Sequence, residues 1–132
     1  MFDPPPAIRK FMDVTGVKNL PMLTDERMAT LMPRYGLDVR RLDEEARAAA
    51  FGRLAPLVLE IGSGHGAAAR AYAAARPEHD VLAAEVHVPG IARMLAAAEK
   101  EGLTNLRVHR GDAQAVAHGR VGGRAAALAE DA

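Results

Sequence analysis

A short apolar run that leads directly into a glycine-rich loop constrains the fold of this chain more than any other feature. Residues 57–61 are Leu-Val-Leu-Glu-Ile, preceded by Pro56, and residues 62–66 are Gly-Ser-Gly-His-Gly. An apolar run of this length between Pro and Gly is typical of a strand buried on both faces of a parallel sheet. Glycines after such a strand allow a sharp turn and let a ligand approach the main chain. The run therefore predicts an α/β fold.

Further strands and helices alternate after this loop. We expect a helix over residues 65–75, a strand over residues 80–86, a helix from Pro89 to Glu101 and a third strand over residues 106–108. Pro89 suits the first turn of its helix, and Gly102 suits the position just after its end. Alternation at this spacing predicts right-handed βαβ units and one parallel sheet.

The residues on either side of this unit carry weaker patterns. Before it, we expect a helix that begins at Thr24 and is ended by Pro33 and Gly36, and a second helix from about Asp38 to Ala50. Residues 117–132 show neither strand alternation nor an apolar stripe. That composition predicts a tail with weak structure.

Composition excludes several kinds of protein. The 132 residues contain no cysteine, which excludes disulfides and thiolate metal sites. Basic and acidic residues balance at 17 each, so a contact with nucleic acid would need a local basic face. The apolar stretches are too short to cross a bilayer. Because the first residues also lack the pattern of a signal peptide, we expect a cytoplasmic protein.

Glu60, the acid at the end of the first strand, distinguishes between two cofactors. The glycine loop alone leaves both possible, because Gly62-x-Gly64-x-x-Ala67 also satisfies a loose dinucleotide pattern. A carboxylate at this place would repel a pyrophosphate, whereas it suits the amino group and sulfonium of S-adenosylmethionine (SAM). Glu60 therefore favours SAM over NAD. The alternative is a plain tight turn with an acid at a strand end.

Two more acids follow the next two strands. Glu85 lies 23 positions after Gly62, where a carboxylate accepts hydrogen bonds from ribose hydroxyls. Asp112 follows the third strand and is placed to accept from an adenine amino group, although it is equally well explained as a loop acid. Ligands of open α/β sheets bind at the carboxyl ends of the strands. With Glu60, the three acids predict a nucleoside site at this edge.

Two histidines and five arginines lie close to this region in the sequence. His65 and His87 have no metal-ligand spacing, so we expect them at the rim of the site and expect no metal. The arginines are interspersed with acids, which favours a solvated helix face over a phosphate-binding surface. They are Arg34, Arg40, Arg41, Arg47 and Arg53.

Several runs together resemble the bacterial tRNA (guanine-N7-)-methyltransferases. Residues 33–38 are similar to that family's P-R-Y-G-L segment, with Met32 in place of the usual Trp. The other similar runs lie at residues 51–53 (F-G-R), 56–62 (P-L-V-L-E-I-G), 85–90 (E-V-H-x-P-G), 105–108 (N-L-R-V) and 112–113 (D-A). The E-V-H-x-P-G run is more distinctive than any general methyltransferase motif.

The resemblance implies a Rossmann-like class I SAM-dependent methyltransferase fold and an enzyme that methylates N7 of guanine in tRNA. SAM would be the cofactor and tRNA the partner. By position, Glu60, Glu85, Asn105 and Asp112 would bind SAM, together with the loop glycines Gly62, Gly64 and Gly66.

The chain also departs from the family pattern. The family's P-D-P-W motif, which carries an acid considered catalytic, should follow Asp112, and nothing there resembles it. We therefore assign no catalytic residue and expect a C-terminally truncated member with about three parallel strands. The expected parts are an N-terminal arm and helices (1–50), a SAM-binding half-domain (51–116) and the tail (117–132).

Two alternatives to an active enzyme stay open. One is a non-catalytic fragment that binds SAM or a nucleotide, which would form a homodimer if a strand edge were exposed. The other is an NAD-binding half-domain, against which Glu60 and the run from Glu85 to His87 both count.

Overall fold

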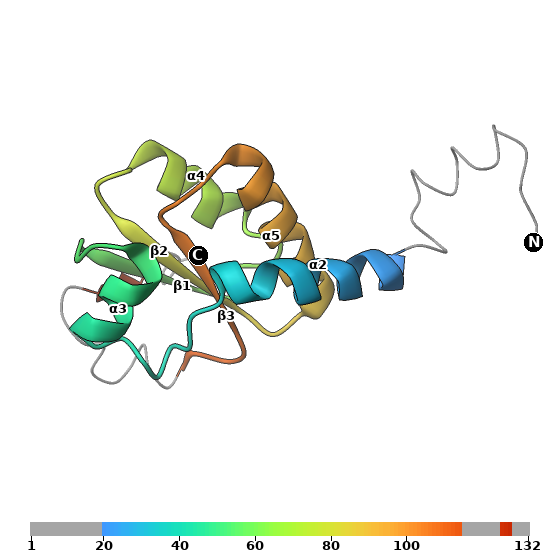
Figure 1. Cartoon of the computed structure of the whole chain (residues 1–132), viewed down its shortest axis with the longest axis horizontal. Helices are drawn as coiled ribbons and strands as arrows, with labels where there is room; N and C mark the ends of the chain where they lie inside the picture. Colours follow the sequence, from blue (N-terminus) through green and yellow to red (C-terminus); the bar gives the residue numbers. More distant parts are fainter. Residues whose placement is uncertain (1–19, 115–124, 128–132) are drawn as a thin grey trace, which may run out of the picture.

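The computed structural model describes residues 20–114 and 125–127. In chain order its elements are α2 (Leu20–Tyr35), α3 (Glu44–Phe51), β1 (Leu57–Ile61), α4 (Ala67–Ala75), β2 (Asp80–Glu85), α5 (Val88–Glu101), β3 (Leu106–Arg110) and β4 (Ala125–Ala127) (Figure 1). From β1 to β3 the strands and helices match the predicted ones to within two residues at each end. None of the helices in these described ranges is long and apolar enough to span a bilayer.

The strands form one parallel sheet in the order β3-β2-β1-β4. Leu59 pairs with Leu82, and Ala83 pairs with Val108, so the three predicted strands lie in register at the centre of the fold. Helices connect them, which is the Rossmann-like arrangement that the alternation predicted.

Strand β4 adds to the three predicted strands and lies within the segment predicted to be a weakly structured tail. Residues 125–127 pair with Leu57–Leu59 on the outer side of β1. Three alanines carry no alternation of apolar and polar residues, so the sequence holds no local signal for this strand. Its formation depends on the free edge of β1, which is distant in sequence. The other residues of the predicted tail, and residues 1–19, lie outside the described ranges.

Both faces of the sheet are covered. One face packs against α2, α4 and α5 in a core that includes Val81, Ile91 and Leu95. The other face packs against α3 and the preceding loop, with Leu59 and Leu82 at its centre. Leu59 and Leu82 are at most 1% exposed, and burial of each such side chain contributes about 1.5–3 kcal/mol. This double cover explains why the strands are continuous apolar runs.

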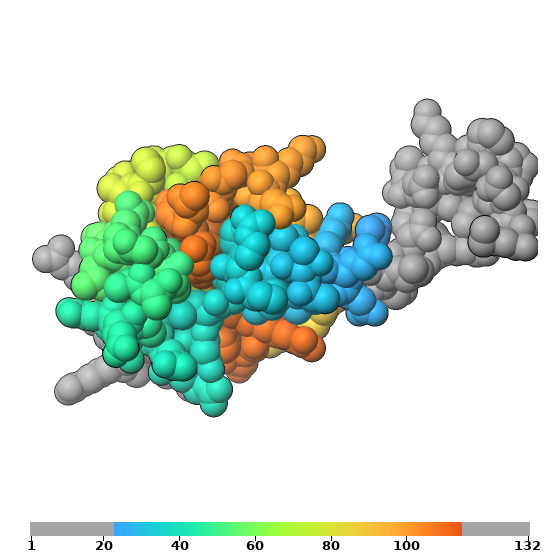
Figure 2. All heavy atoms as spheres, viewed as in Figure 1, coloured from blue at the N-terminus to red at the C-terminus, as the bar shows by residue number. Residues whose placement is uncertain are grey.

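Helix α2 differs from its predicted bounds at both ends. It begins at Leu20 rather than Thr24, and it continues through Pro33 to Tyr35. Proline removes one hydrogen bond from a helix interior. Here the last turn is held by packing, because the Tyr35 side chain is 4% exposed within the core. Figure 2 shows α2 and the following loop, in blue to teal, lying against the orange surface of α5 and β3.

Helix α3 is shorter than the predicted helix over residues 38–50. It begins at Glu44, where the Asp43 carboxylate caps it by accepting from the Ala46 N–H at 2.8 Å. The residues before it are held as a loop by β3. The Leu37 N–H donates to the Val108 carbonyl at 3.0 Å, and the Val39 N–H donates to His109 Nδ1 at 3.1 Å. Both contacts hold these residues against β3.

Candidate cofactor site

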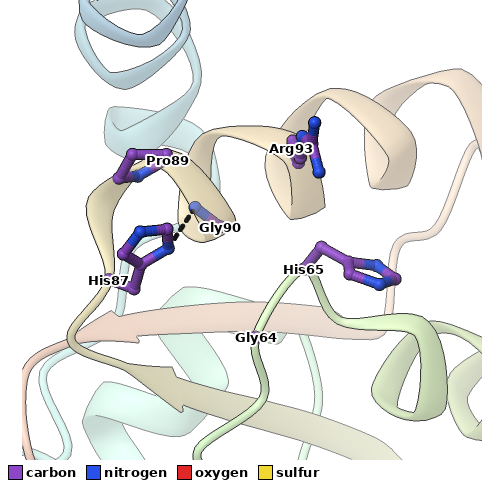
Figure 3. A pocket seen from close by; sticks show the side chains of 6 residues that line it. All are labelled: Gly64, His65, His87, Pro89, Gly90 and Arg93. Atoms are coloured by element: carbon purple, nitrogen blue, oxygen red, sulfur yellow. Dashed lines mark hydrogen bonds between the residues drawn. The ribbon is translucent and has the colours of Figure 1, made fainter.

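The carboxyl ends of β1, β2 and β3 meet at one edge of the sheet, where two cavities lie. The smaller, of about 270 Å³, is lined by Gly62, Glu85, Val86 and Asp112 among others. The larger, of about 410 Å³, lies between the glycine loop and the first turns of α5 (Figure 3). Ligands of open parallel sheets bind at this edge.

The contact between the glycine loop and helix α5 needs glycine at two positions, one in the loop and one in the helix. Gly66 has φ 81°, and a Cβ there would lie 2.4 Å from Cγ of Met94. A Cβ on Gly90 would lie 2.8 Å from the carbonyl oxygen of Gly64. Because left-handed backbone and close approach both favour glycine, helix α5 can pack directly onto the loop. The loop is thereby fixed beside both cavities.

Glu85 connects the loop to the end of β2. Its Oε1 accepts from the Gly64 N–H at 2.6 Å, and its Oε2 accepts from the N–H groups of Val86 and His87 at 2.9 and 2.8 Å. Burial alone would raise the pKa of Glu85, but the N–H donors of His87, Gly64 and Val86 together lower it. The side chain is therefore an ionised carboxylate that lines the smaller cavity.

Glu60 is the most deeply buried acid of the site. The residue is 2% exposed, and its Oε2 has no hydrogen-bond partner among the described residues. Burial raises the pKa of Glu60, against a smaller opposing effect of Ser63. Buried polar atoms in native proteins are nearly always hydrogen-bonded. Glu60 Oε2 is thus an acceptor beside the glycine loop that the described residues leave without a donor, although Glu60 lines neither cavity.

Asp112 lies at this edge as predicted, and Asn105 does not. Asp112 lines the smaller cavity, and its Oδ1 accepts from the Gln114 N–H at 3.0 Å. Asn105 precedes β3, so it lies at the opposite, amino end of the strand. Its buried side-chain amide donates to the main-chain carbonyls at the end of α4 and the following turn, those of Ala73, Arg76 and His79. The prediction that Asn105 contacts the cofactor is wrong for this geometric reason.

The two predicted rim histidines line the larger cavity. His65 lies on the loop side, and His87 lies at the start of α5 (Figure 3). The Nδ1 atom of His87 caps α5 by accepting from the Gly90 N–H at 3.2 Å. Sequence reasoning did not identify Arg93 or Val86, which line the larger and the smaller cavity respectively. No sequence signal distinguished Arg93 from the other arginines.

Four of the five clustered arginines have partners within the fold. Arg34 pairs with Glu99 at 2.8 Å, and Arg53 pairs with Asp80 at 2.7 Å. Arg40 pairs with Asp38, and the buried Arg47 donates to the carbonyl of Ala55. Arg34 and Arg40 are exposed, as expected for a solvated face, whereas Arg47 is buried and differs from that expectation.

Comparisons with known proteins match the chain to methyltransferases. A family model described as "Putative methyltransferase" matches residues 54–121. The chain is 44% identical to a tRNA (guanine-N(7)-)-methyltransferase of Methylococcus capsulatus over 111 residues, which are 84% of this chain and 46% of that protein. It is 40% identical to the enzyme of the same name of Chromohalobacter salexigens, over 83% of this chain and 44% of that protein.

The chain thus spans somewhat less than half the length of these curated relatives. Among solved structures it is similar to the 16S rRNA methyltransferase KamB, at 21% identity and a TM-score of 0.48, over 60% of this chain and 40% of that one. Together with its motifs, the family model and the relatives show that the chain belongs to this methyltransferase family and is similar, over most of its length, to tRNA (guanine-N7-)-methyltransferases.

Proposed function

We propose that this chain provides the SAM-binding part of an enzyme that methylates N7 of guanine in tRNA. The names of the relatives support this reaction. The observation that carries it is the buried Glu60 carboxylate, whose Oε2 has no partner among the described residues. An orphaned acceptor at this place fits a ligand that carries an amino group.

We assign described residues to SAM group by group. Glu60 would accept from the amino group of the methionine part, and Glu85 from the ribose hydroxyls. Asp112 would accept from the adenine amino group, and the glycine loop would let the ligand approach the main chain. When bound, SAM supplies a methyl group on a positively charged sulfur.

Methylation of guanine N7 requires little acid–base catalysis from the protein. The atom carries a lone pair and no proton, so no base has to remove one. The main task of the chain is to hold the donor so that the methyl group and N7 can be aligned, because orientation alone can supply much of a rate enhancement. No Pro-Asp-Pro-Trp segment occurs in these 132 residues, and we assign no catalytic residue.

NAD fits the site less well than SAM. A dinucleotide would bring a pyrophosphate to the glycine loop, where Glu60 and Glu85 lie close to the same turn. Like charges in a buried site repel strongly. With tRNA as its partner, we place the protein in the cytoplasm. Homodimer formation stays a prediction, which size-exclusion chromatography with light scattering would test.

Calorimetric titration tests the cofactor assignment. The 132-residue chain should bind SAM and S-adenosylhomocysteine but not NAD, and Glu60→Gln should weaken binding of both adenosyl ligands by about tenfold, because a hydrogen bond to a charged group is lost. Glu78→Gln is the matched control, since Glu78 is exposed and precedes β2 at the other edge of the sheet. No binding of SAM by the wild-type chain would refute the proposal.

A further inference from the structure

Of the residues assigned above to SAM, only Gly64 lines the larger cavity. Its walls are Gly64 and His65 from the loop, and His87, Pro89, Gly90 and Arg93 from α5 and the residue that caps it. Figure 3 shows the loop below the cavity and α5 above it. A volume of about 410 Å³ is in the range of small-molecule sites. This volume is larger than one small ion would fill.

The groups that line this cavity are donors and a cation. Arg93 is exposed and forms no hydrogen bond or ion pair with any other described residue. His87 accepts at Nδ1, so its neutral ring carries the proton on Nε2. The main-chain N–H of His65 has no partner within the described ranges. None of the six lining residues carries a carboxylate.

Other arginines of the fold form ion pairs, whereas Arg93 forms none with the described residues. Arg34 and Arg53 are neutralised by acids, and Arg70 pairs with Glu101 at the other end of α5. The start of α5 contributes few free donors of its own, because Pro89 has no N–H and the Gly90 N–H is taken by His87. A ligand in this cavity would therefore be held by side chains, with Arg93 as the main charge.

We propose that this cavity binds an anionic oxygen group, a phosphate or a carboxylate, that is part of a larger ligand. Arg93 is its main contact, and His65 and His87 are hydrogen-bond donors. Arginine recognises such groups through paired N–H donors. Under the proposed function the group is either a phosphate of the RNA backbone or the carboxylate of the methionine part of SAM. Anion binding itself does not depend on that function.

Titration with inorganic phosphate tests the cavity directly. In ¹H–¹⁵N NMR spectra of the 132-residue chain, the resonances of His65 and Arg93 should shift and saturate. Arg93→Gln and, independently, His65→Ala should weaken this response, whereas the matched variant Arg41→Gln should not. Arg41 is likewise exposed, but it lies in the loop that covers the other face of the sheet. Shifts that fail to saturate, or that persist unchanged in Arg93→Gln, would overturn the proposal.

Affinities of the same variants identify the source of the anion. If the group is an RNA phosphate, Arg93→Gln should weaken binding of an unmodified tRNA transcript by about tenfold and lower the salt dependence by about one ion. S-adenosylhomocysteine should then bind as before. If the group is the carboxylate, Arg93→Gln should weaken the binding of S-adenosylhomocysteine. It should not weaken the binding of 5′-methylthioadenosine, which has no carboxylate.

Unchanged affinity for all three ligands in Arg93→Gln would overturn the proposal even if free phosphate binds. A wild-type chain that binds neither an adenosyl ligand nor tRNA would instead refute the proposed function. In that case the phosphate titration still decides whether the cavity is an anion site.

Discussion

At the scale of single residues, glycine at position 66 is required by two separate constraints. Its φ of 81° disfavours any side chain, and a Cβ would also overlap Met94. Gly52 has a similar φ of 76° but has open space around it. Comparing substitutions at Gly66 and Gly52 therefore separates the free-energy cost of the backbone conformation from that of overpacking.

We expect Gly66→Ala to destabilise the chain by about 2–4 kcal/mol and Gly52→Ala by about 1 kcal/mol. The difference arises because only Gly66→Ala forces Met94 or helix α5 to move. Urea denaturation followed by circular dichroism measures both free energies of unfolding. Equal losses in the two variants would show that Met94 adapts without cost.

Residue chemistry also explains which of the predicted site residues the structure brings together. Glu60, Glu85 and Asp112 come together at one sheet edge as expected, because each lies within two residues of the carboxyl end of a parallel strand. That placement follows from local patterns alone. The Gly64 N–H that donates to Glu85 is 21 residues away, and the absence of a partner for Glu60 Oε2 among the described residues also depends on distant neighbours, so neither could be predicted.

At the scale of elements, Asn105 joins α4 to the sheet. Its amide donates to three carbonyls around the end of α4, within a buried environment. Asn105→Ala should therefore destabilise the chain by about 1–3 kcal/mol, since buried carbonyls lose their donor. SAM affinity, measured at a temperature where the variant is folded, should change less than twofold. A large loss of SAM affinity without loss of stability would restore the role predicted from the family motif.

The loop between α2 and α3 is joined to β3 through His109, whose Nδ1 must carry no proton in order to accept a hydrogen bond. His109 accepts there from the Val39 N–H, with Asp38 at 3.9 Å and Arg40 on the same loop. Burial lowers the pKa of His109 below its ordinary 6.5, against an opposing effect of Asp38 and with a further lowering by Arg40. The unfolded chain therefore binds this proton more readily than the folded one.

Stability should consequently fall as the pH drops from 7 through the ordinary pKa of histidine. Replacing His109 with Gln should flatten this dependence between about pH 7 and 5.5. His65→Gln is the control, because His65 is exposed and its ring forms no hydrogen bond with this loop among the described residues. Thermal unfolding across the pH range measures the effect. An unchanged slope in His109→Gln would assign the pH dependence to other groups.

At the scale of the whole molecule, cofactor binding and methyl transfer are separate properties of these residues. The three acids and the glycine loop form one edge of a folded sheet, whereas no Pro-Asp-Pro-Trp segment is present. We expect measurable but weak SAM affinity and little methyl transfer by the 132-residue chain. Transfer of labelled methyl groups to unmodified tRNA, with 7-deazaguanosine tRNA as the control, measures this. Full turnover would show that the family's acid is dispensable.

The sequence alone determined the α/β class, the positions of β1, β2 and β3, and the edge where Glu60, Glu85 and Asp112 lie. These features follow from patterns within a few residues, such as apolar runs bounded by Pro and Gly. The tertiary structure decided that Asn105 supports α4, that α2 continues through Pro33, and that β4 pairs with β1. It also placed Arg93, which forms no ion pair with another described residue, at a cavity. Each of these depends on contacts between segments far apart in the chain, which local patterns do not encode.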